Sequence, residues 1–144
     1  MIYISHRGNL NGPDPSMENN PEQIIKCIKE GFDVEIDVWF LEGWYLGHDE
    51  PQYKVDMEFL NTKGLWCHAK NIEALLQLRN YNINCFWHQE DDVTLTSSGF
   101  LWTFPGKKLT EMSICVMPEI HRPDLSSCAG ICTDYPIKYS KEIK

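Results

Sequence analysis

The sequence predicts an α/β fold, and more narrowly an abbreviated TIM-type (β/α)8 barrel from which several outer helices are missing. Strand-like and helical segments alternate in the first half of the chain, which indicates parallel βαβ units. Several strand-like segments are almost entirely apolar, as is typical of parallel strands covered on both faces. Eight such segments fall within 144 residues, whereas a full barrel of this type needs about 250. We therefore expect a single domain, residues 1–144, whose second half has lost most of its helices.

The eight expected strands are short, are rich in β-branched, aromatic and cysteine residues, and are followed by polar or turn-forming residues. They are Ile2–Ser5, Phe32–Phe40, Trp44–Gly47, Leu65–Ala69, Cys85–His88, Leu101–Phe104, Ile114–Met117 and Ala129–Thr133.

Two segments carry the marks of helices. Residues 21–28 begin with a proline, follow Asn20 as an N-cap and end before Gly31. Asn71 is expected to cap a second helix, in which apolar residues recur at helical spacing. Both helices stand between expected strands, where parallel pairing needs crossover connections.

The charge balance limits the classes of partner. Thirteen Lys and Arg against 21 Asp and Glu give a formal charge of -8. Such a surface repels nucleic acid and anionic membranes, although a metal ion and local cations can still hold a small anionic substrate. No run approaches the roughly 20 apolar residues of a membrane span, and residues 1–7 do not read as a secretory signal. We expect six reduced cysteines and a cytoplasmic location.

A run of alternating carboxylates is the most informative segment. Alternate side chains of a strand share a face, so Asp33, Glu35 and Asp37 point one way and the valines and isoleucine between them point the other. Carboxylates on one face repel each other unless a cation lies between them. Glu35 and Asp37 are therefore candidate ligands of a hard divalent ion such as Mg²⁺ or Ca²⁺.

Two histidines follow expected strands. His6 and Arg7 come at the end of the first strand, and His48 ends the strand after the carboxylate run. Arginine offers a planar fork to phosphate oxygens, and histidine titrates near neutral pH. Two histidines with a carboxylate pair are what metal-assisted acid–base cleavage of a phosphodiester needs.

These motifs, in this order, resemble the N-terminal signature of the glycerophosphodiester phosphodiesterase family, which has a phospholipase C-like barrel. The matching segments are His6-Arg7-Gly8, Glu18-Asn19, residues 31–38 and Gly47-His48-Asp49, with residues 129–136 similar to the closing strand of the family. The resemblance implies a TIM-type barrel and a divalent metal ion. It also implies site roles: Glu35 and Asp37 as metal ligands, His6 and His48 as the acid–base pair, and Arg7 near the substrate phosphate with Glu18 as a nearby polar support. Lys70 is expected as a further substrate-binding residue.

The chain departs from the family where a third metal-binding carboxylate is usually followed, two residues on, by a lysine. The corresponding run is Leu65–Lys70, in which Lys70 matches and His68 replaces the carboxylate. As a ligand, imidazole would shift the metal preference toward Mn²⁺ or Zn²⁺. The alternative is that His68 lies outside the metal shell and the ion is held by two carboxylates and waters.

Two classes of function follow from these residues. The first is metal-dependent hydrolysis, or cyclising cleavage, of a small phosphodiester such as a glycerophosphodiester. The second is a catalytically silent barrel that binds phosphorylated ligands. Because too few residues remain to cover every strand with a helix, we also expect a homo-oligomer that buries part of the wall formed by residues 100–104 and 113–117. The alternative is a monomer in which the loops around residues 92–99 and 120–127 fold back over these strands.

Overall fold

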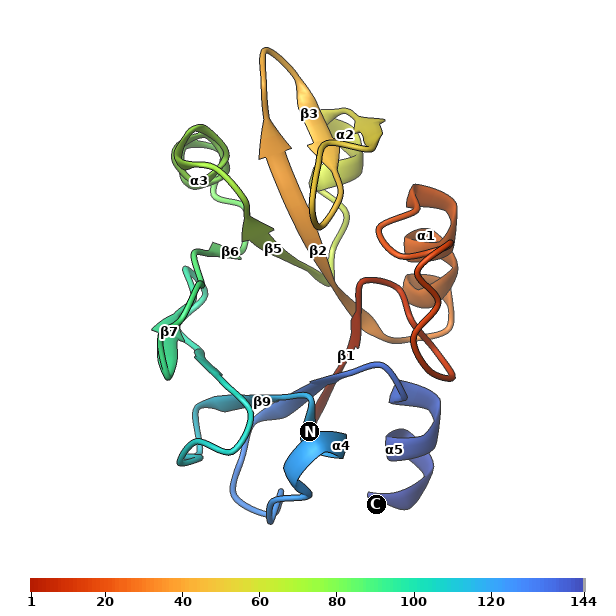
Figure 1. Cartoon of the computed structure of the whole chain (residues 1–144), viewed down its shortest axis with the longest axis vertical. Helices are drawn as coiled ribbons and strands as arrows, with labels where there is room; N and C mark the ends of the chain where they lie inside the picture. Colours follow the sequence, from red (N-terminus) through yellow and green to blue (C-terminus); the bar gives the residue numbers. More distant parts are fainter. Residues whose placement is uncertain (144) are drawn as a thin grey trace.

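The computed structural model describes residues 1–143, which form a mixed ten-stranded sheet and five short helices (Figure 1). The elements in chain order are β1 (Ile2–His6), α1 (Pro21–Lys29), β2 (Asp33–Phe40), β3 (Trp44–Leu46), β4 (Tyr53–Val55), α2 (Met57–Leu60), β5 (Leu65–Ala69), α3 (Ile72–Asn80), β6 (Cys85–Phe86), β7 (Val93–Leu95), β8 (Leu101–Thr103), β9 (Ser113–Val116), α4 (Pro118–His121), β10 (Gly130–Thr133) and α5 (Pro136–Glu142).

The sheet has a parallel centre and antiparallel additions. Parallel pairing runs in the order β6-β5-β2-β1-β10-β9-β8. Antiparallel pairing adds β3 and β4 beyond the end of β2, and β7 beside β8. The sheet is strongly curved (Figure 1), and Ser97 N donates to the Cys85 carbonyl, so the segment after β7 lies against β6.

The predicted abbreviated TIM-type (β/α)8 barrel is wrong. The fold is a mixed ten-stranded sheet in which helices do not alternate with strands. The physical reason is chain length: short hairpins and loops connect strands with far fewer residues than a helical crossover requires. The two strands that were not expected, β4 and β7, are joined to neighbouring strands by such connections, as is β3, which was expected as a strand of the barrel.

Both expected helices form, with the expected N-caps. The side chain of Asn20 accepts hydrogen bonds from Glu22 N and Gln23 N, and the side chain of Asn71 accepts one from Ala74 N. Asn71 also bonds both the N–H and the carbonyl of Phe40 through its amide, which ties the start of α3 to the end of β2.

The outer face of the sheet packs on the helices. Alternate residues of β2, namely Val34, Ile36 and Val38, are fully buried in one cluster with residues of α1 and α3. This is the face opposite the carboxylates, as the alternation of the sequence predicts.

The inner side of the curved sheet holds a second, aromatic cluster. One residue from each of several strands contributes to it: Ile4, Trp66, Phe86, Trp102, Ile114 and Cys132. Phe86 stacks on Trp102 with ring centroids 4.5 Å apart, and Trp66 lies 5.9 Å from Trp102. The polar site lies directly beyond this cluster, toward the carboxyl ends of the parallel strands.

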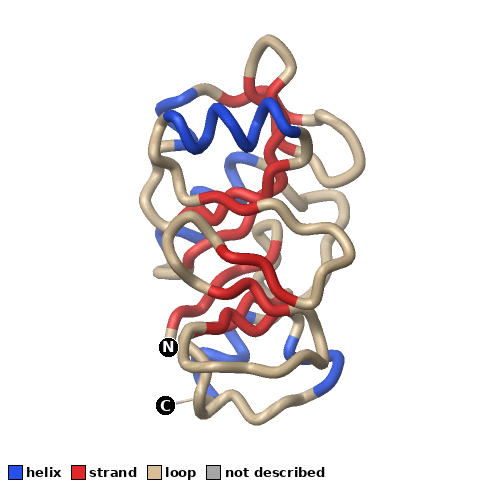
Figure 2. The backbone as a smooth tube through the Cα atoms, turned by 90° about the vertical axis from the view of Figure 1, so that its left-hand side faces the viewer, coloured by secondary structure: helices blue, strands red, loops and turns tan. Residues whose placement is uncertain are grey.

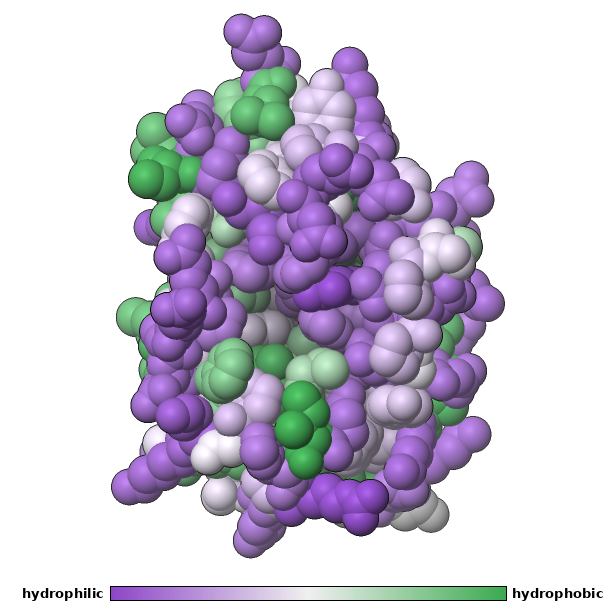
Figure 3. Space-filling model, in the orientation of Figure 1, coloured by the Kyte–Doolittle hydropathy of each residue, from purple (hydrophilic) through white to green (hydrophobic). Residues whose placement is uncertain are grey.

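The wall expected to be bare is largely covered. Thr103, Ser113 and Cys115, which alternate with the inner-cluster residues of β8 and β9, are buried in the isolated chain. Figure 2 shows loops rather than helices over the lower part of this side. The apolar side chains exposed in the second half are instead Val93, Leu95, Phe104, Met112 and Ile120. On the face in Figure 3, hydrophilic side chains predominate and apolar ones form small separate groups.

Two further expectations concern cysteines and membranes. All six cysteines are free thiols, and five of them are buried. None of the helices within residues 1–143 has the length and apolar character needed to cross a membrane.

Candidate active site

The polar site begins one step beyond the inner aromatic cluster. Alternate residues of a strand share a face, so the residue two positions after each inner core residue points to the same side. In this way Ile4 is followed by His6, Trp66 by His68, and Cys132 by Asp134. The parallel register aligns these strands, with His6 beside Glu35 and His68 beside Asp37. Functional side chains therefore gather at the carboxyl ends of the parallel strands.

Two buried carboxylates of β2 form the centre of the site. Glu35 is 3% exposed and Asp37 is 1% exposed. The amide of Asn19 holds Asp37 in place, because its Nδ2 donates to Asp37 Oδ2 at 2.9 Å and its Oδ1 accepts from Asp37 N at 2.9 Å. Asn19 has a φ of 58°, a left-handed conformation that asparagine tolerates better than most residues.

The surroundings shift the pKa values of the two carboxylates in opposite directions. Burial and the neighbouring charge of Asp37 raise the pKa of Glu35. Burial alone would also raise the pKa of Asp37, but the close approach of His48, His68 and Arg7 outweighs it and holds that pKa well below its usual range. Asp37 is therefore ionised at neutral pH.

His6 and Asp134 form a hydrogen-bonded pair. His6 Nδ1 lies 2.8 Å from Asp134 Oδ1, and because a carboxylate only accepts, Nδ1 carries the proton. His6 Nε2 then faces Glu35, 4.0 Å from its Oε2. Burial alone would lower the pKa of His6, but the bond to Asp134 and the charge of Glu35 outweigh it and raise that pKa. Asn9 donates to Asp134 at 2.8 Å, so the carboxylate that orients His6 is itself held.

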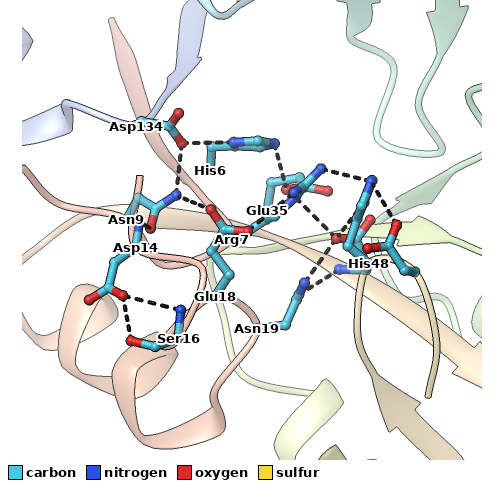
Figure 4. A network of polar contacts seen from close by, with 12 residues as sticks. His6, Arg7, Asn9, Asp14, Ser16, Glu18, Asn19, Glu35, His48 and Asp134 are labelled. Carbon is cyan, nitrogen blue, oxygen red and sulfur yellow. Dashed lines mark hydrogen bonds and ion pairs between the residues drawn. The ribbon is translucent and has the colours of Figure 1, made fainter. Parts of the chain in front are cut away.

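Arg7 lies between the two histidines (Figure 4). Its Nη1 donates to Glu18 Oε2 at 3.2 Å, and its Nη2 lies 3.3 Å from His48 Nε2. Since a guanidinium only donates, His48 Nε2 is the acceptor of this contact. His48 Nδ1 faces Asp37 Oδ2 at 3.5 Å. Glu18 also accepts from Asn9 at 3.0 Å, which links the Arg7 and His6 sides of the site.

A glycine turn positions His48. Gly47 has a φ of 154°, and a Cβ there would lie 1.9 Å from the Glu50 carbonyl oxygen, so no other residue fits. The indole of Trp39 donates to the Gly47 carbonyl at 2.7 Å. The turn that carries His48 is therefore fixed from both sides.

His68 and Lys70 approach the carboxylates from β5 and its end. His68 Nδ1 lies 3.2 Å from Asp37 Oδ1 and 3.8 Å from Glu35 Oε1. Lys70 Nζ lies 3.8 Å from Asp37 Oδ1. Burial alone would lower the pKa of His68, but Asp37 and Glu35 outweigh it and raise that pKa.

The donor set fits a divalent cation. Glu35, Asp37 and His68 each offer a ligand atom, all within 4.8 Å of one another. Among the described residues, Glu35 Oε2 and Asp37 Oδ1 are buried and accept no hydrogen bond, a costly state for a carboxylate oxygen. The site contains four carboxylates, Glu18, Glu35, Asp37 and Asp134, and two cationic side chains, Arg7 and Lys70. With neutral histidines its formal net charge is therefore -2.

Two hollows of the surface differ in their relation to this site. One of about 200 Å³ opens beside Arg7 and His48 and is lined also by Glu18, Glu50 and Gln52. A larger one of about 940 Å³ lies at the amino end of β1 and is lined by Met1, Tyr3, Leu125, Cys128 and Tyr139. Arg7, Asn19 and His48 line the small hollow and all three approach Asp37, so this hollow lies beside the polar site.

The structure brings together every residue that the sequence singled out for the site: His6, Arg7, Glu18, Glu35, Asp37, His48, His68 and Lys70. Three further residues were missed in these roles. Asn9 and Asn19 sit in a loop without periodicity, and Asp134 follows the closing strand 128 residues after its partner His6. Asp134 could have been found from its position directly after a buried strand, and Asn19 from its place in the matching segment Glu18-Asn19.

No protein-family model, no curated protein and no solved structure matches the chain. The resemblance to glycerophosphodiester phosphodiesterases therefore stays a prediction.

Proposed function

We propose that the protein is a metal-dependent phosphodiesterase that cleaves a small phosphodiester, such as a glycerophosphodiester, by acid–base catalysis with His6 and His48. One observation carries the proposal: two histidines flank Arg7 beside a pair of buried carboxylates (Figure 4). Each carboxylate has one oxygen without a hydrogen bond among the described residues: Glu35 Oε2, which faces His6, and Asp37 Oδ1, which faces His68. One cluster thereby contains a base for the attacking hydroxyl, an acid for the leaving alcohol, an arginine that can bind phosphate, and ligands for a metal ion.

His6 is suited to the role of base. Its Nδ1 proton is held by Asp134, so the lone pair of Nε2 is directed into the site. The proton of the attacking hydroxyl passes to Nε2 as its oxygen bonds to phosphorus, and Asp134 stabilises the resulting imidazolium. The attacking hydroxyl belongs either to water or to the substrate itself, which gives hydrolysis or a cyclic phosphate.

His48 is suited to the role of acid. The bond from phosphorus to the leaving alcohol breaks, and that oxygen takes a proton from His48. In the structure His48 Nε2 accepts from Arg7 and carries no proton. Before His48 acts as the acid, Arg7 must therefore turn to the substrate phosphate and Nε2 must take up a proton from solvent. Lys70, beside Asp37, is placed to bind another phosphoryl oxygen. With 41% of its side chain exposed, His48 regains its proton from solvent.

Glu35 and Asp37 would hold the divalent ion, and His68 lies beside them on β5. When bound, the ion supplies positive charge to the phosphoryl oxygens and offsets the charge of the carboxylate pair. The protein contributes the fixed position of these ligands, through the Asn19 clamp on Asp37 and the register between β2 and β5.

Turnover of a panel of small phosphodiesters tests the proposal. We expect cleavage that is abolished by a chelator and restored by a divalent ion. The panel should include glycerophosphodiesters with neutral, anionic and cationic alcohols, together with a monoester control. If the protein binds phosphodiesters but cleaves none of them with any metal ion, the proposed enzymatic function is refuted and a catalytically silent phosphate-binding protein is supported instead.

The setting of this activity is part of the proposal. Free thiols throughout the chain support a reducing compartment, and we place the protein in the cytoplasm. We propose a homo-oligomer as its working form, with the exposed apolar residues of the second half at the interface.

A further inference from the structure

The metal centre contains a nitrogen ligand whose direction is fixed by the fold. We propose that His68 Nδ1 coordinates the metal ion together with Glu35 and Asp37, and that the centre is selective for a first-row transition ion such as Mn²⁺, Fe²⁺, Co²⁺ or Zn²⁺ over Mg²⁺ and Ca²⁺. This inference rests on the metal centre of the proposed function, although it does not depend on the substrate.

The orientation of His68 comes from two contacts outside the cluster. Its Nε2 lies 2.9 Å from the His88 carbonyl oxygen, which only accepts, so Nε2 carries a proton. Its ring stacks on Phe86 with centroids 5.2 Å apart and an interplanar angle of 6°. Nδ1 is thereby directed to the carboxylates. Metal-bound histidines characteristically donate their other N–H to a carbonyl in this way.

One oxygen of each carboxylate is buried and accepts no hydrogen bond from the described residues, which leaves both carboxylates available to a cation. Asp37 Oδ1 lies 3.2 Å from Nδ1 and yet accepts no hydrogen bond within the described chain. Glu35 Oε1 lies 3.8 Å from the same nitrogen, and the second oxygen of Glu35 is buried without a donor. Three donor atoms that lie close together without bonding each other are arranged like ligands of one ion.

The chemistry of the ligands sets the class of ion. Mg²⁺ and Ca²⁺ are hard cations that take oxygen ligands almost exclusively. Imidazole nitrogen binds Mn²⁺, Fe²⁺, Co²⁺ and Zn²⁺ far better. Two carboxylates and one neutral imidazole also leave no net charge once a divalent ion is bound.

Pulsed electron paramagnetic resonance on the Mn²⁺-loaded full chain tests coordination directly. We expect nitrogen modulation from one imidazole in the wild type and in His88→Ala, which keeps the His88 backbone carbonyl. We expect its loss in His68→Ala. Absence of nitrogen modulation in the wild type at stoichiometric Mn²⁺, or its persistence in His68→Ala, would overturn the proposal.

Calorimetric titration with Mn²⁺ and with Mg²⁺ tests selectivity. The ratio of the two affinities should fall by at least about tenfold in His68→Glu, which restores an all-oxygen ligand set. An unchanged ratio would place His68 outside the metal shell. Phosphodiester turnover is measured separately: imidazole coordination without turnover would refute the proposed function alone, and turnover without imidazole coordination would refute this inference alone.

Discussion

Replacing Asn19 by alanine should destabilise the protein strongly, although no substrate contact is assigned to Asn19. The substitution removes both hydrogen bonds that hold Asp37, one of them to an ionised carboxylate that is 1% exposed. A hydrogen bond to a charged group is worth about 1.5–3 kcal/mol, and a buried donor left unpaired costs about 1–3 kcal/mol. Alanine at a φ of 58° adds about 1–2 kcal/mol of backbone strain.

The expected loss in the free energy of unfolding is therefore at least about 3 kcal/mol, measured by urea denaturation with a chelator present. Asn19→Gly accepts the positive φ and should be less destabilised than Asn19→Ala by about 1 kcal/mol. Asn82→Ala is the matched control, because exposed Asn82 has a φ of 56° but no side-chain hydrogen bond among those found in residues 1–143. If Asn19→Ala loses no more stability than Asn82→Ala, the clamp on Asp37 is not what holds this part of the fold.

Three further predictions concern the His6–Asp134 pair, the Gly47 turn that carries His48, and the oligomeric state. Asp134→Asn should reduce turnover by at least about 100-fold and lower the pKa of His6, as measured by NMR titration; an unchanged pKa would contradict the pairing. The same variant should flatten the pH dependence of stability. The Asp134 contribution, present above about pH 4, is lost as the pH falls through its lowered pKa, and the His6 contribution, complete below about pH 6.5, is lost as the pH rises through its raised pKa. Gly47→Ala should displace the His48 turn and abolish turnover while metal binding persists, and normal turnover would refute the role of that turn. Light scattering at micromolar concentration should show an oligomer, and a mass of 16.8 kDa would contradict it.

The buried and polar faces of β2 and the starts of the two helices could be predicted from the sequence, because they depend on residues close together in the chain. The alternation in β2 correctly separated Glu35 and Asp37 from the apolar face, and the caps at Asn20 and Asn71 are both present. Strand ends were also informative, because parallel strands bring residues at their carboxyl ends to one edge. This is why His6 and His68 meet the carboxylates of β2.

The architecture was not readable because strand pairing is not local. The eight apolar segments did not indicate that β3, β4 and β7 pair antiparallel with their neighbours. These pairings take the place of the helical crossovers that a barrel requires. The role of Asn19 was not predicted, although Glu18-Asn19 is one of the matching segments, and the reason is related. Its role depends on a single left-handed residue reaching a strand 18 positions away, and no pattern in the sequence encodes that contact.

Cleavage of a small phosphodiester by His6→Ala and His48→Ala tests the central claim most directly. The metal-loaded wild type should cleave the diester, and each variant should lose at least about 100-fold in rate while retaining its fold and its metal affinity, because each histidine transfers a proton. His121→Ala, which removes an exposed histidine on α4, should leave the rate unchanged. A near-normal rate in either His6→Ala or His48→Ala would contradict the paired-histidine mechanism.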